Sequence, residues 1–337
     1  MALVGAGDLA GAASRGSSMS RVSVVMSVYN GGRYLRDAVD SILSQSFRDF
    51  EFIILNDGST DDSGQIIDNY RDRRIKVVEN RENIGLTRSL NRGLSMGRGE
   101  YVARMDADDI SLPKRFECQV AFLDAHPEVG VLGTAAQLID ASGTKGEIIR
   151  FSAEHGFLKW LMCFVTNPII HPTVMVRRHW TEQAGGYDEN MVTSQDYELW
   201  CRLSGRIGLA NLADVHLLLR KHDENISTLR LKEGIEKVFE VNNRLVAEVL
   251  GGEVADAEMR SLWKFVFDSR NILPREAEAA AGLIRRLRRS FLAGGSLSPE
   301  EEAMVRRDAI ERLKTLWRAR SKKSRCKQLL ADFIYRR

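Results

Sequence analysis

Residues 101–109 read Tyr-Val-Ala-Arg-Met-Asp-Ala-Asp-Asp, so a short apolar segment leads directly into three aspartates. An apolar, β-branched run of this kind predicts a buried β-strand. Side chains two positions apart in an extended chain point to the same side. We therefore expect the carboxylates of Asp106 and Asp108 to converge where the strand ends.

The acidic run has two chemical interpretations, and its residues alone leave both open. Adjacent carboxylates repel each other unless a cation lies between them, and Mg²⁺ or Mn²⁺ binds such oxygens together with substrate phosphates. The alternative is an acidic turn that caps a helix, because Ser-Leu-Pro follows at 111–113. The run therefore predicts either a divalent-cation site or a helix cap.

Outward from this strand, towards the N-terminus, short strands alternate with helices. The pattern predicts strands at 22–28, 50–55 and 75–78 and helices over 33–46, around Ile66 to Tyr70, and over 86–96. Such alternation indicates βαβ units, and hence an α/β fold with a doubly wound, largely parallel sheet flanked by helices. In sheets of this type, ligands bind beyond the carboxyl ends of the strands.

Polar residues stand at those strand ends. Asn30 follows the first strand, Asp57 the second, and Asp106 and Asp108 the fourth. The carboxylate of Asp57 could accept a hydrogen bond from a ring N–H or a ribose hydroxyl. The alternative is a turn and helix cap within residues 56–62, which are rich in Asp, Ser and Thr.

The rest of the chain becomes progressively helical. After Pro113 the pattern predicts a helix over 114–125, strands at 129–132 and 173–176, and helical segments near 154–165 and 197–203. Further helices are predicted over 235–249, 257–268, 276–292 and 299–319. We therefore expect a flexible leader (1–20), a catalytic domain (21–228, with halves 21–115 and 116–228) and a C-terminal all-helical extension (229–337).

Composition narrows the class of protein. The 337 residues are 44% hydrophobic and 28% charged, which is typical of a globular chain, and the longest apolar runs are far shorter than the roughly 20 residues of a membrane span. Four scattered cysteines without a Cys-x-x-Cys pair argue against a structural zinc site and a disulfide framework. A cytoplasmic location fits this pattern best.

The ordered set of motifs resembles the family 2 glycosyltransferases, which have the GT-A fold. The resemblance covers about residues 21–228. It rests on Val-Val-Met-Ser-Val-Tyr-Asn-Gly (24–31), Asn-Asp-Gly-Ser-Thr-Asp-Asp (56–62), Asn-Ile-Gly (83–85), Met-Asp-Ala-Asp-Asp (105–109), Ile-His-Pro-Thr-Val-Met (170–175), Gly-Gly-Tyr-Asp (185–188) and Ser-Gln-Asp-Tyr-Glu-Leu-Trp-Cys-Arg-Leu (194–203).

The resemblance implies an inverting transfer of a sugar from a nucleotide-diphosphate sugar, UDP-linked by preference, to a hydroxyl of a glycan or a lipid-linked glycan. Asp196 would be the general base, although Gln195 replaces the glutamate that often precedes it. The nucleotide sugar would be bound by Val28, Tyr29, Asp57, Arg88 and Asp106. Mn²⁺ or Mg²⁺ would be held by Asp106, Asp108 and His222, with Arg220 or His222 closing over the diphosphate.

Two other functions are alternatives to the transfer of a sugar. A sugar nucleotidyltransferase would require a basic, glycine-rich triphosphate loop after the first strand, and residues 29–33 supply little of one. A catalytically inactive nucleotide-sugar-binding scaffold would be expected to lack one of the carboxylates Asp106, Asp108 or Asp196. Measured turnover of the donor would separate the scaffold from the enzyme.

The C-terminal segment is strongly basic. Residues 281–337 carry 16 Lys and Arg against 6 Asp and Glu. Ile310, Leu313, Leu316 and Trp317 form an apolar stripe at helical spacing, so this helix is expected either to contact the inner face of the cell membrane or to pack on the catalytic domain or a second subunit. No nucleic-acid partner is expected, and a homo-oligomer remains open.

Overall fold

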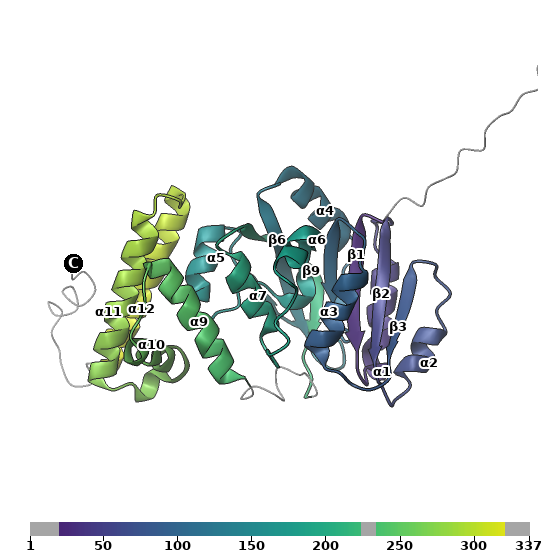
Figure 1. Cartoon of the computed structure of the whole chain (residues 1–337), viewed down its shortest axis with the longest axis horizontal. Helices are drawn as coiled ribbons and strands as arrows, with labels where there is room; N and C mark the ends of the chain where they lie inside the picture. The colour runs from purple at the N-terminus through teal and green to yellow at the C-terminus, as the bar shows by residue number, and fades with distance from the viewer. Residues whose placement is uncertain (1–19, 224–233, 321–337) are drawn as a thin grey trace, which may run out of the picture.

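The computed structural model describes residues 20–223 and 234–320. Figure 1 shows a central sheet flanked by helices, with a stack of C-terminal helices at one end. The N-terminal half consists of β1 (Val22–Val28), α1 (Gly32–Leu43), β2 (Phe50–Asp57), α2 (Ser63–Asp68), β3 (Ile75–Asn80), α3 (Leu86–Met96) and β4 (Tyr101–Met105). The alternation of strands and helices predicted for this half is confirmed.

The strands of this half are all parallel, and their register aligns the strand ends. β1 lies between β2 and β4, and β2 pairs with β3. Val28 at the end of β1 is opposite Asn56, and Asp57 at the end of β2 is opposite Asn80. The polar residues that follow the strands are therefore gathered at one edge of the sheet, as the sequence predicts.

The second half makes the sheet mixed. It consists of β5 (Ile110–Ser111), α4 (Arg115–Ala125), β6 (Val129–Ile139), β7 (Lys145–Ile149), α5 (His155–Met162), the 3₁₀ turn η1 (His171–Thr173), β8 (Met175–Arg177), α6 (Arg178–Gln183), α7 (Gln195–Leu203) and β9 (Gly208–Arg220). The strand order is β3-β2-β1-β4-β8-β6-β9-β5, with β7 beside β6. β8 runs antiparallel to both β4 and β6, whereas β9 is parallel to β6.

Two hydrophobic cores cover the two faces of the sheet. Side chains along β1 alternate between them, since Val24 and Met26 join one core and Val25 joins the other. The first core is closed by α1, α2 and α4. The second extends from the sheet through α3, α5 and α7 into the C-terminal helices without interruption.

The C-terminal region is helical, as predicted, and consists of α9 (Ile235–Leu250), α10 (Asp256–Asp268), the 3₁₀ turn η2 (Ser269–Asn271), α11 (Pro274–Ala293) and α12 (Pro299–Arg320). Helices α5 and α7 lie between the sheet and these helices (Figure 1). Among the described residues, no helix is both long enough and apolar enough to cross a membrane. The proposed leader, the boundary at 228 and the end of the basic tail lie outside the described residues.

The apolar stripe of α12 is not available to a membrane. Leu313 and Leu316 are fully buried, and Ile310 and Trp317 pack against the same core. The helix contacts α5 and α11 through this face. The expectation that this stripe inserts into a lipid surface is therefore wrong, and the alternative of packing on the catalytic domain is what the structure has. Packing of this stripe against α5 and α11 removes its apolar side chains from water, so no lipid surface is needed to cover them.

Candidate functional site

The loop after β1 is tied to the loop after β2 by side-chain hydrogen bonds. Asn30 adopts a positive φ of 50°, and its Oδ1 accepts a hydrogen bond from the Thr60 N–H at 2.8 Å. The backbone N–H groups of Gly31 and Gly32 donate to Ser63 Oγ and Asp61 Oδ2, each at 3.0 Å. The Asp, Ser and Thr cluster thus holds two loops together. Val28 is buried at the end of β1, and Tyr29 is 51% exposed at the rim.

Asp57 is buried at the end of β2 and organises the neighbouring loop. Its Oδ1 accepts hydrogen bonds from Asn80 Nδ2 at 2.7 Å and from the Ile84 N–H at 3.0 Å. Its Oδ2 accepts one from the Gly85 N–H at 3.0 Å. The side chain that was expected to contact a nucleotide base therefore already holds the Asn-Ile-Gly segment in place, and Oδ2, which accepts one hydrogen bond, retains a lone pair for a ligand.

The three aspartates after β4 form one cluster, and each has a different protein partner. Asp106 forms an ion pair with the buried guanidinium of Arg104. Asp108 Oδ2 lies 2.9 Å from His222 Nε2. The carboxylate of Asp109 is buried, and its Oδ1 accepts a hydrogen bond from the Arg220 N–H at 2.8 Å. The predicted convergence of Asp106 and Asp108 is present, and Asp109 joins them.

The cluster fits a divalent cation on physical grounds. One carboxylate oxygen from each of Asp106, Asp108 and Asp109 lies within 4.8 Å of the others. Burial and the charge of Asp106 raise the pKa of Asp108, and burial with both neighbouring charges raises the pKa of Asp109 well above its usual value. Asp109 Oδ2 is buried without a hydrogen-bond partner among the described residues. Three carboxylates crowded in this way gain from a hard cation.

The carboxyl end of β9 completes this side of the site with Arg220 and, just after it, His222, both of which the family resemblance implied, whereas β9 as a strand and Asp109 were not predicted. The Arg220 guanidinium donates to the backbone oxygen of Asp108 at 2.8 Å and lies over the ring of Tyr34. The ring of His222 also lies next to Tyr34, with 5.1 Å between ring centroids. The third aspartate of the Asp-Ala-Asp-Asp run was the one signal in the sequence that could have identified Asp109.

Asp196 lies at the start of α7, on the other side of the site. The preceding Ser194 takes a left-handed conformation with φ 59°, and Asp196 Oδ2 accepts a hydrogen bond from Asn167 Nδ2 at 2.6 Å. Burial raises the pKa of Asp196, although hydrogen bonds from the Tyr197 backbone and from Asn167, together with the charge of Arg104, oppose the rise. A carboxylate with a raised pKa accepts a proton more readily than an exposed one.

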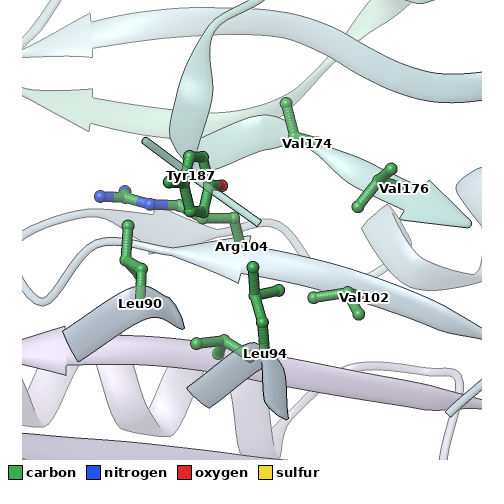
Figure 2. A pocket seen from close by; sticks show the side chains of 8 residues that line it. Leu90, Leu94, Val102, Arg104, Val174, Val176 and Tyr187 are labelled. Atoms are coloured by element: carbon green, nitrogen blue, oxygen red, sulfur yellow. The ribbon is translucent and has the colours of Figure 1, made fainter. Parts of the chain in front are cut away.

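Arg104 connects the two sides electrostatically. Its charge acts on Asp106, to which it is ion-paired, and on Asp196. Burial and the same charge hold the pKa of His171 well below its usual value, and His171 Nε2 lies 2.8 Å from the Tyr187 hydroxyl. Figure 2 shows Arg104 and Tyr187 at a small cavity of about 10 Å³, with the guanidinium pointing away from the valine side chains. This cavity holds at most one water molecule and is no substrate pocket.

Arg88, another sequence-predicted site residue, pairs with a surface carboxylate instead of joining these contacts. It lies near the start of α3 with 61% of its side chain exposed and pairs with Glu189 at 3.4 Å. Among the described residues, no hydrogen bond or ion pair joins it to Asp57 or to the acidic cluster.

Comparison with known proteins identifies the group to which this architecture belongs. The family described as "Glycosyl transferase family 2" matches residues 23–183, which include Asp57 and the acidic cluster but neither Asp196 nor His222. The amylovoran biosynthesis glycosyltransferase AmsE of Erwinia amylovora is 31% identical over 218 residues, 62% of this chain and 79% of its own. The chain belongs to glycosyltransferase family 2.

Two further relatives of this family 2 glycosyltransferase agree. EpsE of Bacillus subtilis is 38% identical over 192 residues, 55% of this chain and 67% of its own. The O-antigen biosynthesis glycosyltransferase WbnJ of Escherichia coli is 30% identical over 214 residues, 61% of this chain and 82% of its own. The resemblance inferred from the motifs is therefore confirmed.

Solved structures share the fold over nearly the whole length. S. aureus TarS 1–349, solved with UDP-GlcNAc, has a TM-score of 0.60 at 20% identity and covers 93% of this chain and 89% of its own. The mannosyltransferase PcManGT of Pyrobaculum calidifontis, solved with GDP-Man and Mn²⁺, has a TM-score of 0.50 at 16% identity. The match covers 94% of this chain and 86% of PcManGT. Likeness at this identity shows the GT-A fold alone.

Proposed function

We propose that this glycosyltransferase transfers a sugar with inversion from a nucleotide-diphosphate sugar, UDP-linked by preference, to a hydroxyl of a glycan or a lipid-linked glycan. The observation that carries the proposal is the separation of two kinds of carboxylate. Asp106, Asp108 and Asp109 are crowded together at the end of β4, whereas Asp196 is buried alone with an amide donor at the start of α7.

The acidic cluster is assigned to the donor side. Asp106, Asp108 and Asp109, with His222 beside Asp108, would hold Mn²⁺ or Mg²⁺. A bound divalent cation would neutralise the charge that develops on the leaving diphosphate. The loop of Val28 and Tyr29 and the carboxylate of Asp57 border the same edge of the sheet and would bind the nucleotide. Arg88 would reach the nucleotide only by leaving Glu189.

Asp196 is assigned as the general base. Its Oδ1 is the oxygen not engaged by Asn167 and would accept the proton of the attacking hydroxyl. A single base suffices because the sugar moves in one displacement, which inverts the anomeric centre. Positioned general-base catalysis contributes about 10²–10⁴-fold to the rate.

The donor and the acceptor are assigned from chemistry and from the relatives' names. TarS was solved with UDP-GlcNAc and PcManGT with GDP-Man, which supports a nucleotide-diphosphate sugar. AmsE and WbnJ are named for amylovoran and O-antigen biosynthesis, which supports a polysaccharide or its lipid-linked precursor as the acceptor.

A panel of nucleotide sugars tests this function. We expect Mn²⁺-dependent release of nucleoside diphosphate with at least one UDP-sugar, and a loss of about 10²-fold or more in Asp196→Asn with unchanged UDP affinity. Asp108→Ala should abolish turnover and remove the metal dependence of UDP binding in calorimetry. A wild-type protein that binds UDP equally well with and without Mn²⁺ would contradict the metal site. A protein that binds donor but never turns it over would be the scaffold.

We also propose a peripheral contact with anionic lipid at the cytoplasmic face, made by charge rather than by an apolar stripe. Arg289, Arg306, Arg307 and Arg318 are exposed on α11 and α12. Each such cation near an anionic surface contributes about 1 kcal/mol. The full-length protein should sediment with anionic vesicles at low salt. Substitution of these four arginines by Gln should lower the fraction of protein that sediments. Equal binding to neutral vesicles would contradict the proposal.

A further inference from the structure

Strained backbone surrounds Asp196. Among the described residues, the non-glycine residues with a positive φ are Asn30, Val165 and Ser194. Val165, at φ 57°, is β-branched, a residue type that rarely adopts this conformation. Ser194 precedes Asp196 by two positions, and Val165 precedes Asn167 by two. Strain of this kind persists where the surrounding structure fixes it, and it is concentrated at functional sites.

The Asn167 amide has an unusual hydrogen-bond pattern. Its Nδ2 donates to Asp196 Oδ2 at 2.6 Å. Its Oδ1 is buried and has no hydrogen-bond partner among the described residues. An asparagine that merely stabilises a turn normally satisfies its carbonyl oxygen, because burial of an unpaired acceptor is unfavourable. The orientation of the amide is set by the carboxylate, which can only accept when ionised.

We propose that Asn167 is a positioning residue, which holds the Asp196 carboxylate by one charge-assisted hydrogen bond so that its other oxygen faces the acceptor hydroxyl. The inference rests on the proposed role of Asp196 as the base. The strained turn at Val165 brings Asn167 to α7 from the segment that follows α5, and Pro168 follows it directly. The hydrogen bond favours the ionised form of Asp196, which is the form that a base requires.

The other charged and titratable groups near Asp196 belong to neighbouring elements, and a substitution of Asn167 leaves these residues unchanged. They are Arg104 on β4 and Tyr187 in the loop before α7, with His171 of η1 paired to Tyr187. The neighbouring charges therefore form a constant background, against which the amide can be varied alone.

Two substitutions of Asn167 are designed to act in a graded way. Asn167→Leu keeps the approximate shape and removes the donor, whereas Asn167→Asp places a second carboxylate against Asp196. We expect kcat to fall roughly 10-fold in Asn167→Leu and further in Asn167→Asp, with the donor KM within about 2-fold of wild type. The acid limb of the kcat–pH profile should move to higher pH in the same order, because the ionised base loses its donor and then meets a like charge.

Asn243→Leu is the matched control. Asn243 lies on α9 and also has a buried side-chain oxygen without a hydrogen-bond partner in the described part of the chain. Its replacement should leave kcat and the pH profile as in wild type. A general effect of replacing an asparagine whose buried oxygen has no partner would therefore appear in the control as well.

The outcomes separate this inference from the proposed function. Wild-type turnover in Asp196→Asn would overturn the base itself. An inactive Asp196→Asn together with an unmoved acid limb in Asn167→Leu would overturn the positioning role alone. If Asn167→Leu proves poorly folded by circular dichroism, the nearly isosteric Asn167→Asp decides, and an acid limb at the wild-type position in that variant overturns the inference.

Discussion

Aspartate illustrates how far the surroundings of a residue decide its role. Asp61 holds a turn and Asp57 holds a loop, whereas Asp109 is buried beside two like charges and Asp196 is buried beside an amide. The sequence offers the same carboxylate each time. The donors and charges around it decide whether it stabilises backbone, attracts a cation or accepts a proton.

Asp57→Asn tests the role of the loop-holding carboxylate. One side-chain oxygen becomes an NH₂ group, so the donors to that oxygen lose their acceptor: the Gly85 N–H if Oδ2 is replaced, or the Ile84 N–H and Asn80 Nδ2 if Oδ1 is replaced. We expect the free energy of unfolding to fall by about 1–3 kcal/mol, because buried donors lose their partner, and UDP affinity to fall with it. Chemical denaturation and calorimetry measure the two effects.

Asp62→Asn is the control for that substitution. Asp62 is exposed before α2 and makes no side-chain cap to that helix. Its replacement should change the free energy of unfolding by less than about 0.5 kcal/mol. A loss of nucleotide affinity in Asp57→Asn without any loss of stability would show that Asp57 acts on the ligand directly rather than through the loop.

At the scale of elements, a buried polar network joins α7 to the C-terminal helices. Asn242 on α9 donates to the backbone oxygens of Met162 and Cys163 and to the Tyr197 hydroxyl. Its Oδ1 accepts a hydrogen bond from Trp263 Nε1 at 2.8 Å. Tyr197 immediately follows Asp196, so the start of α7 is held from behind by α9 and α10.

Asn242→Leu should therefore destabilise the fold strongly. Four polar partners each lose one hydrogen bond within a buried site, while the Tyr197 hydroxyl and the Met162 oxygen keep their bond to each other. We expect the free energy of unfolding to fall by about 2–4 kcal/mol. Urea denaturation of this variant beside Asn243→Leu, a neighbour without such a network, measures the difference. Equal stability of the two variants would contradict the structural role of the network.

The helices and parallel strands were predictable because their patterns are local. The helix predicted over 86–96 has those bounds, since its apolar positions recur at helical spacing between two glycines. Strand β9 was missed because its burial pattern is irregular: exposed residues interrupt it near Ala213, and its register against β6 shifts. The apolar stripe of α12 was recognised, but the surface that covers it comes from distant segments that no local pattern describes.

The site was predictable to a similar extent. Asp106 and Asp108 are neighbours in sequence, so their convergence follows from strand geometry. The contact of Asp108 with His222 depends on β9, and the contact of Asp196 with Asn167 depends on a strained turn at Val165. The first contact was expected only from the family resemblance, which placed His222 with Asp108, and the second has no signature in the sequence.

At the scale of the whole molecule, buried neutral histidines link stability to pH. His155 at the start of α5 accepts a hydrogen bond at Nδ1 from the Leu209 N–H at 3.1 Å. Burial and, to a lesser extent, Lys159 lower its pKa. Because the unfolded chain then binds a proton more readily, stability from this group is present above pH 6.5 and is lost as pH falls below it.

His155→Asn isolates this effect, because the asparagine oxygen can replace Nδ1 as the acceptor. Between pH 7 and pH 5, the free energy of unfolding should fall less in the variant than in wild type. The difference between the two proteins is at most about 1.4 kcal/mol per pH unit, because one group titrates. Denaturation curves at several pH values give the difference between the two proteins. The raised pKa values of Asp109 and Asp196 act in the opposite direction in both proteins and cancel in that difference. Parallel pH curves would contradict the assignment.

The uninterrupted core from the sheet to α12 limits how this enzyme can be re-engineered. Trp160 of α5 packs against Phe291 of α11 and donates to Asp308 of α12 at 2.7 Å. A chimera that replaced α11 and α12 by unrelated helices would leave Trp160 without these partners. The exchangeable unit is therefore larger than the acidic motifs at the sheet edge, and a graft must carry α5 and α7 together with the helices that cover them.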